Sequence, residues 1–119
     1  MLLAVAQEAG GGVVESVWRG PASRPDLAAL GGTLVEVFCD CESAVARERY
    51  RQRASTRSPG HFDTMRLASD DLWTGESAEP IAGPWPVVHV HTDRPVALAD
   101  VAVQVRHSAV RGLQTRRDR

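Results

Sequence analysis

The sequence predicts an α/β fold in which a small parallel sheet is flanked by helices. Three segments rich in β-branched and other apolar residues are typical of strands, near residues 13–17, 33–39 and 87–91. Segments with apolar residues at helical spacing lie between and after them. Strands that alternate with helices favour parallel pairing through right-handed crossovers. We therefore expect one three-stranded sheet with helical layers and an open edge where further strands belong.

The first third of the chain alternates between helix and strand signals. Apolar residues recur at helical spacing over residues 1–9, and the glycines at 10–12 end that helix. A buried strand is expected at 13–17 and a loop from Trp18 to Pro25, where proline suits the start of a short helix through Leu30. Because the first helix begins at Met1 without a cap, we expect that the chain was cut within an existing element; a frayed natural terminus is the alternative.

The clearest strand in the sequence covers residues 33–39, interrupted only by Glu36. A helix follows, starting at Asp40 or near Ser43 and running to about Ala54. We expect a polar loop over 55–60, a short helix over 61–69 and a long loop over 70–86, which contains several glycines and prolines.

A third strand over 87–91 leads to the last predicted helix, which spans about residues 96–110 and is closed by Gly112. Its expected apolar stripe consists of Leu98, Val101, Ala102, Val105 and Ala109. Residues 111–119 are expected to form a disordered basic tail.

Composition indicates one ordinary globular domain of 119 residues, with 43% hydrophobic and 24% charged residues. The net charge of -1 gives no global attraction to nucleic acid or to anionic membranes. No apolar run is long enough to cross a bilayer, and the N-terminus does not have the pattern of a signal peptide. Cys39 and Cys41 are interpreted as reduced thiols, since a disulfide across one residue is strained, which predicts a cytoplasmic protein.

Arginines provide the strongest local signal for a binding site. The sequence has no lysine, so all 14 positive side chains are arginines. Arg49, Arg53 and Arg57 are spaced by four residues and share a helix face, although like charges at that spacing repel. Since arginine forks bind phosphate oxygens, a nearby anion explains the row; a solvated helix face is the alternative. The loop over 57–63 that follows fits either a mobile lid or an ordinary connector.

Four segments resemble one known family when taken together: 36–41 (EVFCDC), 46–53 (ARERYRQR), 57–63 (RSPGHFD) and 91–96 (HTDRPV). They resemble the C-terminal half of the bacterial AAA-type P-loop small-molecule kinases, the group of chloramphenicol phosphotransferase, gluconate kinase and adenylate kinase-like proteins. The resemblance covers roughly residues 13–106. It implies a partial P-loop NTPase-like three-layer fold over residues 1–110, with a lid near 42–69.

By this resemblance the intact parent protein would transfer phosphate from ATP, with Mg²⁺, to a small molecule. Arg53 and Arg57 would act on the transferred phosphate as catalytic residues. The other implied site residues are Arg49, Arg94 and Pro95 on the nucleotide side and Glu15, Trp18 and His61 on the substrate side. No residue is implied as a metal ligand.

The sequence departs from the family at its most diagnostic motif. Without any lysine, the phosphate loop G-x-x-x-x-G-K-[ST] is absent, and the glycines at 10–12 do not replace it. The main-chain cradle for the phosphates and the hydroxyl that holds magnesium are missing with it. We therefore expect this chain alone to be inactive and to bind ATP and Mg²⁺ only weakly.

Two other functions stay open at this point. One is a non-enzymatic remnant or interaction protein, which as a homodimer would cover its open sheet edge. The other is an arginine-rich module that binds nucleic acid or another anion, against which the near-neutral net charge argues.

Two smaller alternatives concern individual side chains. Zinc bound by Cys39, Cys41, His89 and His91 is conceivable, but the spacing matches no structural zinc motif and small core residues are the simpler interpretation. Trp18, Trp73 and Trp85 either line a substrate pocket or pack loops onto the core, and we favour packing.

Overall fold

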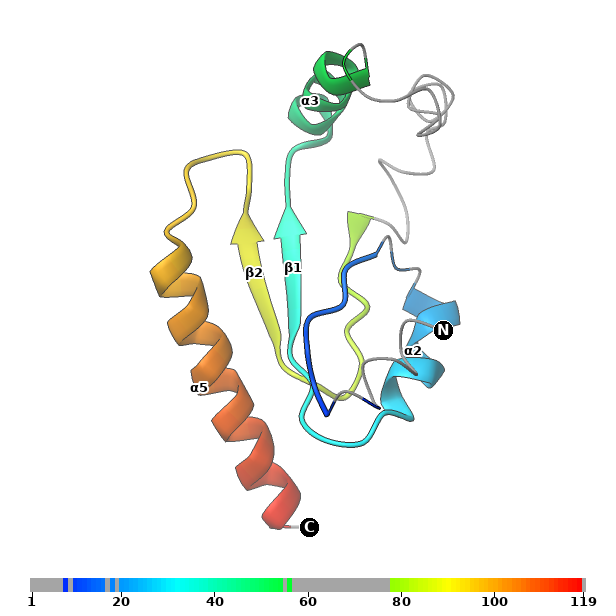
Figure 1. Ribbon diagram of the computed structural model, residues 1–119, viewed down its shortest axis with the longest axis vertical. Helices are drawn as coiled ribbons and strands as arrows, with labels where there is room; N and C mark the ends of the chain where they lie inside the picture. Colours follow the sequence, from blue (N-terminus) through cyan, green and yellow to red (C-terminus); the bar gives the residue numbers. More distant parts are fainter. Residues whose placement is uncertain are drawn as a thin grey trace.

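The computed structural model describes residues 8, 10–16, 18, 20–54, 56 and 78–118. In chain order its elements are α2 (Gly20–Ala28), β1 (Glu36–Asp40), α3 (Ser43–Ala54), β2 (Val87–His91) and α5 (Leu98–Arg117). The two strands form a parallel pair, with Glu36 opposite Val87 and Asp40 opposite His91. Figure 1 shows α3 above the carboxyl end of β1, while α5 runs back alongside β2. The general α/β class that the sequence predicts is confirmed.

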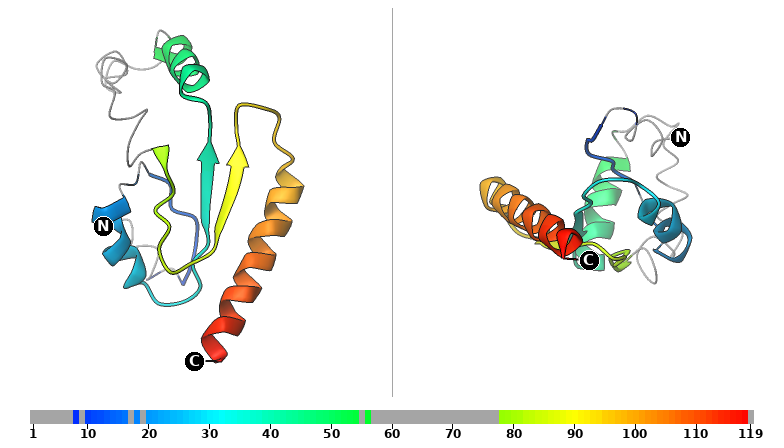
Figure 2. Two further views of the ribbon diagram at one scale, coloured as in Figure 1. Left: turned by 180° about the vertical axis from the view of Figure 1, so that it is seen from behind. Right: turned by 90° about the horizontal axis from the view of Figure 1, so that it is seen from below.

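Helices α2 and α5 lie on opposite sides of the strand pair, as the views in Figures 1 and 2 agree. Helix α5 packs against β2. Buried and exposed side chains alternate along β2, as expected for a strand with one face covered by a helix. Val88 and Val90 are buried, while His89 and His91 are exposed. By register Val37 shares the face of Val88, yet 43% of it is exposed. Only the β2 half of this face is therefore covered within the described part of the chain.

The predicted strand at 87–91 is confirmed, whereas the one at 33–39 begins three residues late, at Glu36. The partner strand explains the late start. The N–H of Glu36 donates to the Pro86 carbonyl over 2.9 Å, and Pro86 itself has no N–H with which to extend the ladder. Before Pro86 the chain turns, since the Trp85 N–H donates to the Gly83 carbonyl. Residues 33–35 thus have no strand to pair with among the described residues.

The predicted buried strand at 13–17 is wrong for the residues that the structure describes there. Residues 13–16 are in no strand, and Val13 is 99% exposed. β-branched residues favour extended backbone, but a strand also needs a partner to receive its hydrogen bonds. The described sheet consequently has two strands instead of three.

The helix predicted over residues 43–54 is confirmed as α3, with the Ala46 N–H donating to the Glu42 carbonyl at its start. Helix α2 instead begins at Gly20, and Pro25 lies inside it. Tertiary contacts explain the earlier start. Gly20 is buried against the main chain of Ile81, and the Arg24 guanidinium donates to the Ile81 carbonyl over 2.8 Å.

The last helix is longer than predicted, because Gly112 does not end it and residues 111–117 are helical rather than a loose tail. A Cβ atom added at Gly112 would be in ordinary contact with Thr33 and Pro86. The Asp118 N–H caps the helix by donating to the Gln114 carbonyl. Within the predicted stripe Leu98 is 77% exposed, whereas Ser108, which the stripe omits, is only 4% exposed. The predicted helices over 1–9 and 61–69 fall, apart from Glu8, outside the described residues.

Within the described residues no helix combines the length and the apolarity that a bilayer span requires.

Candidate functional site

The carboxyl ends of the two strands meet at one edge, which is where open parallel α/β sheets bind their ligands. The last residues of β1 and β2, Asp40 and His91, are directly opposite each other in the register. The Oδ2 atom of Asp40 lies 3.5 Å from Nδ1 of His91, and about half of each side chain is exposed. A carboxylate and an imidazole thus lie side by side at this edge and face solvent.

Thr92 joins the two strand ends. Its N–H donates to the Asp40 carbonyl over 2.7 Å, which adds one step to the parallel ladder, and its hydroxyl donates to the same carbonyl over 3.0 Å. With both bonds made, the segment after β2 is held against the end of β1, and the Thr92 carbonyl is left to face another donor.

Arg49 is that donor. Helix α3 starts two residues after Cys41, so the second helical turn brings Arg49 back over the carboxyl edge. Its Nη1 donates to the Thr92 carbonyl over 2.5 Å and lies 3.9 Å from the Cys41 sulfur. The Nε and Nη2 groups have no partner among the described residues. A guanidinium is therefore held in place at the edge with donors to spare.

Arg94 and Pro95 follow Thr92 and complete this edge. The Arg94 Nε donates to Asp93 Oδ1 over 3.2 Å, and 65% of the Arg94 side chain is exposed. Pro95 is exposed as well. Of the residues implied on the nucleotide side, the structure thus brings Arg49 to the segment that carries Arg94 and Pro95.

Arg53 lies one turn further along α3 and is held by its own helix, with the guanidinium 5.5 Å from the centre of the Tyr50 ring. Among the described residues, the structure gives the Arg53 side chain no hydrogen bond to Thr92 or Arg94. Arg57 and His61, the other predicted lid residues, fall outside the described residues.

The resemblance places Glu15 on the substrate side at the end of the predicted first strand, but residues 13–16 form no strand. Trp18 was expected in a loop, where it could line a substrate pocket. Glu15 is exposed and Trp18 half-buried, and the structure gives neither of them a bond within the residues it describes.

The remaining arginines of α3 are occupied within the molecule. Arg51 pairs with Glu48 one turn before it, and Arg47 also has a partner. The pairing of Arg51 with Glu48 leaves Arg49 and Arg53, two members of the predicted row, without a carboxylate partner among the described residues.

The structure contains no group of three metal-ligating side chains among the residues it describes. Cys39 and Cys41 are free thiols, the first exposed and the second half-buried. The zinc alternative thus has no support in this part of the molecule. Carboxylates suited to Mg²⁺ do not converge there either.

Sequence reasoning missed the role of Glu36, which it treated only as an interruption of a strand. The Glu36 carboxylate accepts hydrogen bonds from the N–H groups of Ile81 and Ala82, over 2.6 and 3.2 Å, and from Nε1 of Trp85 over 2.9 Å. It ties the loop before β2 to the start of β1, at the edge opposite Arg49. The sequence offered one signal for this role. Glu36 is a charged residue within a predicted strand, and Trp85, whose indole N–H needs an acceptor, lies in a later predicted loop. Trp85 agrees with the packing role that we favoured.

Comparison with known proteins found no matching family model, no similar curated protein and no similar solved structure.

Proposed function

We propose that the carboxyl edge of the strand pair binds the phosphate groups of a nucleotide, and that the chain is the C-terminal part of a kinase-like protein that moves phosphate from ATP to a small molecule. One observation carries the proposal: the hydrogen bond from Arg49 to the Thr92 carbonyl. It joins the arginine helix to the segment after β2, the two regions in which the family resemblance expects the phosphates and the adenine.

The chemistry of the edge suits a phosphate-bearing anion. A guanidinium binds phosphate oxygens through two parallel N–H groups, and Arg49 has its Nε and Nη2 groups available for this. Arg94 lies on the adjoining segment and is largely exposed, so it can turn from Asp93 to a stronger acceptor. Asp40 and Asp93 oppose the binding of an anion, which argues for modest affinity.

The described residues do not fit Mg²⁺, and the sequence has no lysine for a phosphate loop. Phosphoryl transfer depends on these charges to stabilise the transferring group. Binding without turnover is therefore the activity that we propose for this chain by itself.

The test is equilibrium binding of ATP, measured by calorimetry without added Mg²⁺. We expect weak, saturable binding of ATP and much weaker binding of adenosine, because the proposed contacts are to phosphate. Arg49→Gln should weaken ATP binding about fivefold, the effect of about 1 kcal/mol for one solvent-exposed ionic contact.

Arg51→Gln is the matched control, since Arg51 is on the same helix but pairs with Glu48. It should leave ATP affinity unchanged. Equal binding of adenosine and ATP, or equal losses in the two variants, would show that the edge is not a phosphate site.

Self-association is a second candidate function, favoured by apolar side chains on the surface. Val37, Val110 and Leu113 are all more than two-fifths exposed, and β1 pairs only with β2 in the described sheet. A dimer that covers these groups would sediment at twice the monomer mass. A monomer at high concentration would remove this candidate and leave the nucleotide proposal unaffected.

A further inference from the structure

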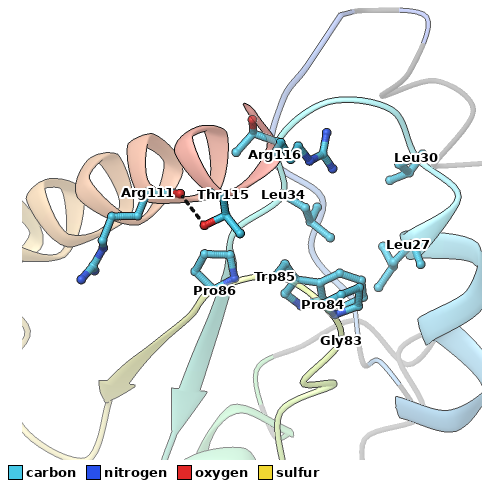
Figure 3. Close-up of a pocket in the computed structure, with 13 residues that line it drawn as sticks. Leu27, Leu30, Leu34, Gly83, Pro84, Trp85, Pro86, Arg111, Thr115 and Arg116 are labelled. Carbon is cyan, nitrogen blue, oxygen red and sulfur yellow. Dashed lines mark hydrogen bonds between the residues drawn. The ribbon is translucent and has the colours of Figure 1, made fainter. Parts of the chain in front are cut away.

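An open groove lies at the amino edge of the strand pair, at the opposite end from Arg49. Its volume is about 600 Å³, within the range of small-molecule sites. Three segments form it: the end of α2 with the loop that follows, the residues just before β2, and the C-terminal half of α5. The close-up in Figure 3 shows these segments around the groove.

The walls of the groove are mostly apolar. Leu27, Leu30 and Leu34 come from the first segment, and Pro84 and Trp85 come from the second. The indole ring is fixed by its hydrogen bond to Glu36 and by close packing on Gly83, so it is a rigid part of the wall. Such a surface favours a ligand with an apolar body, since contact removes apolar area from water.

The charged side chains that line the groove are all positive. The lining residues include Arg111 and Arg116 and no acidic side chain. In Figure 3 Arg116 extends over the groove toward Leu30 and Leu34, whereas Arg111 leads away from Trp85. Within the described part of the chain neither guanidinium has an ionic partner. Arginines in the last turn also offset the helix dipole, so a control must separate that role from binding.

We propose that this groove binds a small amphiphilic carboxylate of the fatty-acid class. The hydrocarbon chain lies against Leu27, Leu30 and Trp85, and the carboxylate pairs with Arg116. A neutral amphiphile would leave the guanidinium without a partner, and a cationic one would be repelled by it. The site is separate from the proposed nucleotide edge, so either can fail without the other.

The test is calorimetric titration with decanoate, kept below the concentration at which it forms micelles. We expect one saturable site, with decanol bound about fivefold more weakly and decyltrimethylammonium more weakly still. Arg116→Gln should bring decanoate down to the affinity of decanol. Arg117→Gln, in the same helical turn but outside the lining, should keep the preference for decanoate.

A second pair of variants tests the groove itself. A Cβ atom at Gly112 would lie 3.7 Å from Thr33 and 4.0 Å from Pro86, in ordinary contact, so Gly112→Ala should fold and bind as before. Gly112→Leu extends a larger side chain into the groove and should weaken decanoate binding at least tenfold. The proposal is overturned if decanol and decanoate bind equally well, or if folded Gly112→Leu, checked by circular dichroism, binds like Gly112→Ala. If Gly112→Leu does not fold, the Arg116→Gln and Arg117→Gln pair decides.

Discussion

The two edges of the strand pair are held together in different ways. At the amino edge one carboxylate, Glu36, receives three hydrogen bonds from a loop that also packs on α2. At the carboxyl edge the contacts are made mainly to main-chain carbonyls, and the side chains of Asp40, His91 and Arg94 stay about half exposed or more. The comparison indicates that the amino edge stabilises the fold, while the carboxyl edge keeps polar side chains exposed to solvent, where a ligand can reach them.

The largest effect should follow from Glu36→Ala. This change leaves the N–H groups of Ile81 and Ala82 and the Trp85 indole without their acceptor in a partly buried place, and Ile81 is only 5% exposed. We expect the free energy of unfolding to fall by about 3 kcal/mol, measured by urea denaturation. Glu48→Ala, which removes an exposed ion pair on α3, should cost well under 1 kcal/mol. Similar losses in both variants would show that the three bonds to Glu36 stabilise the fold no more than an exposed ion pair does.

A smaller loss is expected for Gly83→Ala. A Cβ atom at this position would lie 2.3 Å from the Trp85 ring, so the indole must move and its hydrogen bond to Glu36 must lengthen or break. The expected loss is about 2 kcal/mol, and tryptophan fluorescence should report a more exposed ring. Gly31→Ala is the control, because nothing lies within 4 Å of a Cβ there. An unchanged fluorescence spectrum would mean that Trp85 is not fixed by this packing.

The smallest loss of stability is expected for a change at the carboxyl edge, Thr92→Val. Thr92→Val keeps the shape of the side chain and the main-chain bond but removes the hydroxyl that donates to the Asp40 carbonyl. We expect about 1 kcal/mol of lost stability in thermal or urea unfolding. A loss as large as that of Glu36→Ala would show that the carboxyl edge is also a structural centre, and would weaken its assignment as a binding site.

Local sequence patterns were enough to predict the elements whose bounds depend on their own and neighbouring residues. Strand β2 matches its predicted bounds because alternating valines and histidines define both its faces and its length. Helix α3 matches because its signals are local, from the residues before Ser43 to the polar residues that follow Ala54 in the sequence. The predicted spacing of Arg49 and Arg53 on this helix follows from the same local geometry.

Features that depend on distant partners were predicted poorly. Residues 13–16 were predicted as a strand but pair with no strand in the described part of the chain. Gly112, a residue type that often ends helices, lies inside α5. For the candidate site, the segments 46–53 and 91–96 were singled out in the sequence. That Arg49, and not Arg53, reaches Thr92 could not be derived from spacing, because it depends on how α3 is oriented after β1.

The sequence by itself determined the α/β class, the extents of β2 and α3, and the absence of a lysine-bearing phosphate loop. These follow from residue identity and from hydrogen bonding between near neighbours. Only the tertiary structure decided that Glu36 anchors the amino edge, that Arg49 is held at the carboxyl edge, and that a groove opens beside Trp85. Each of these joins residues more than forty positions apart, and no local preference of the chain specifies such a contact.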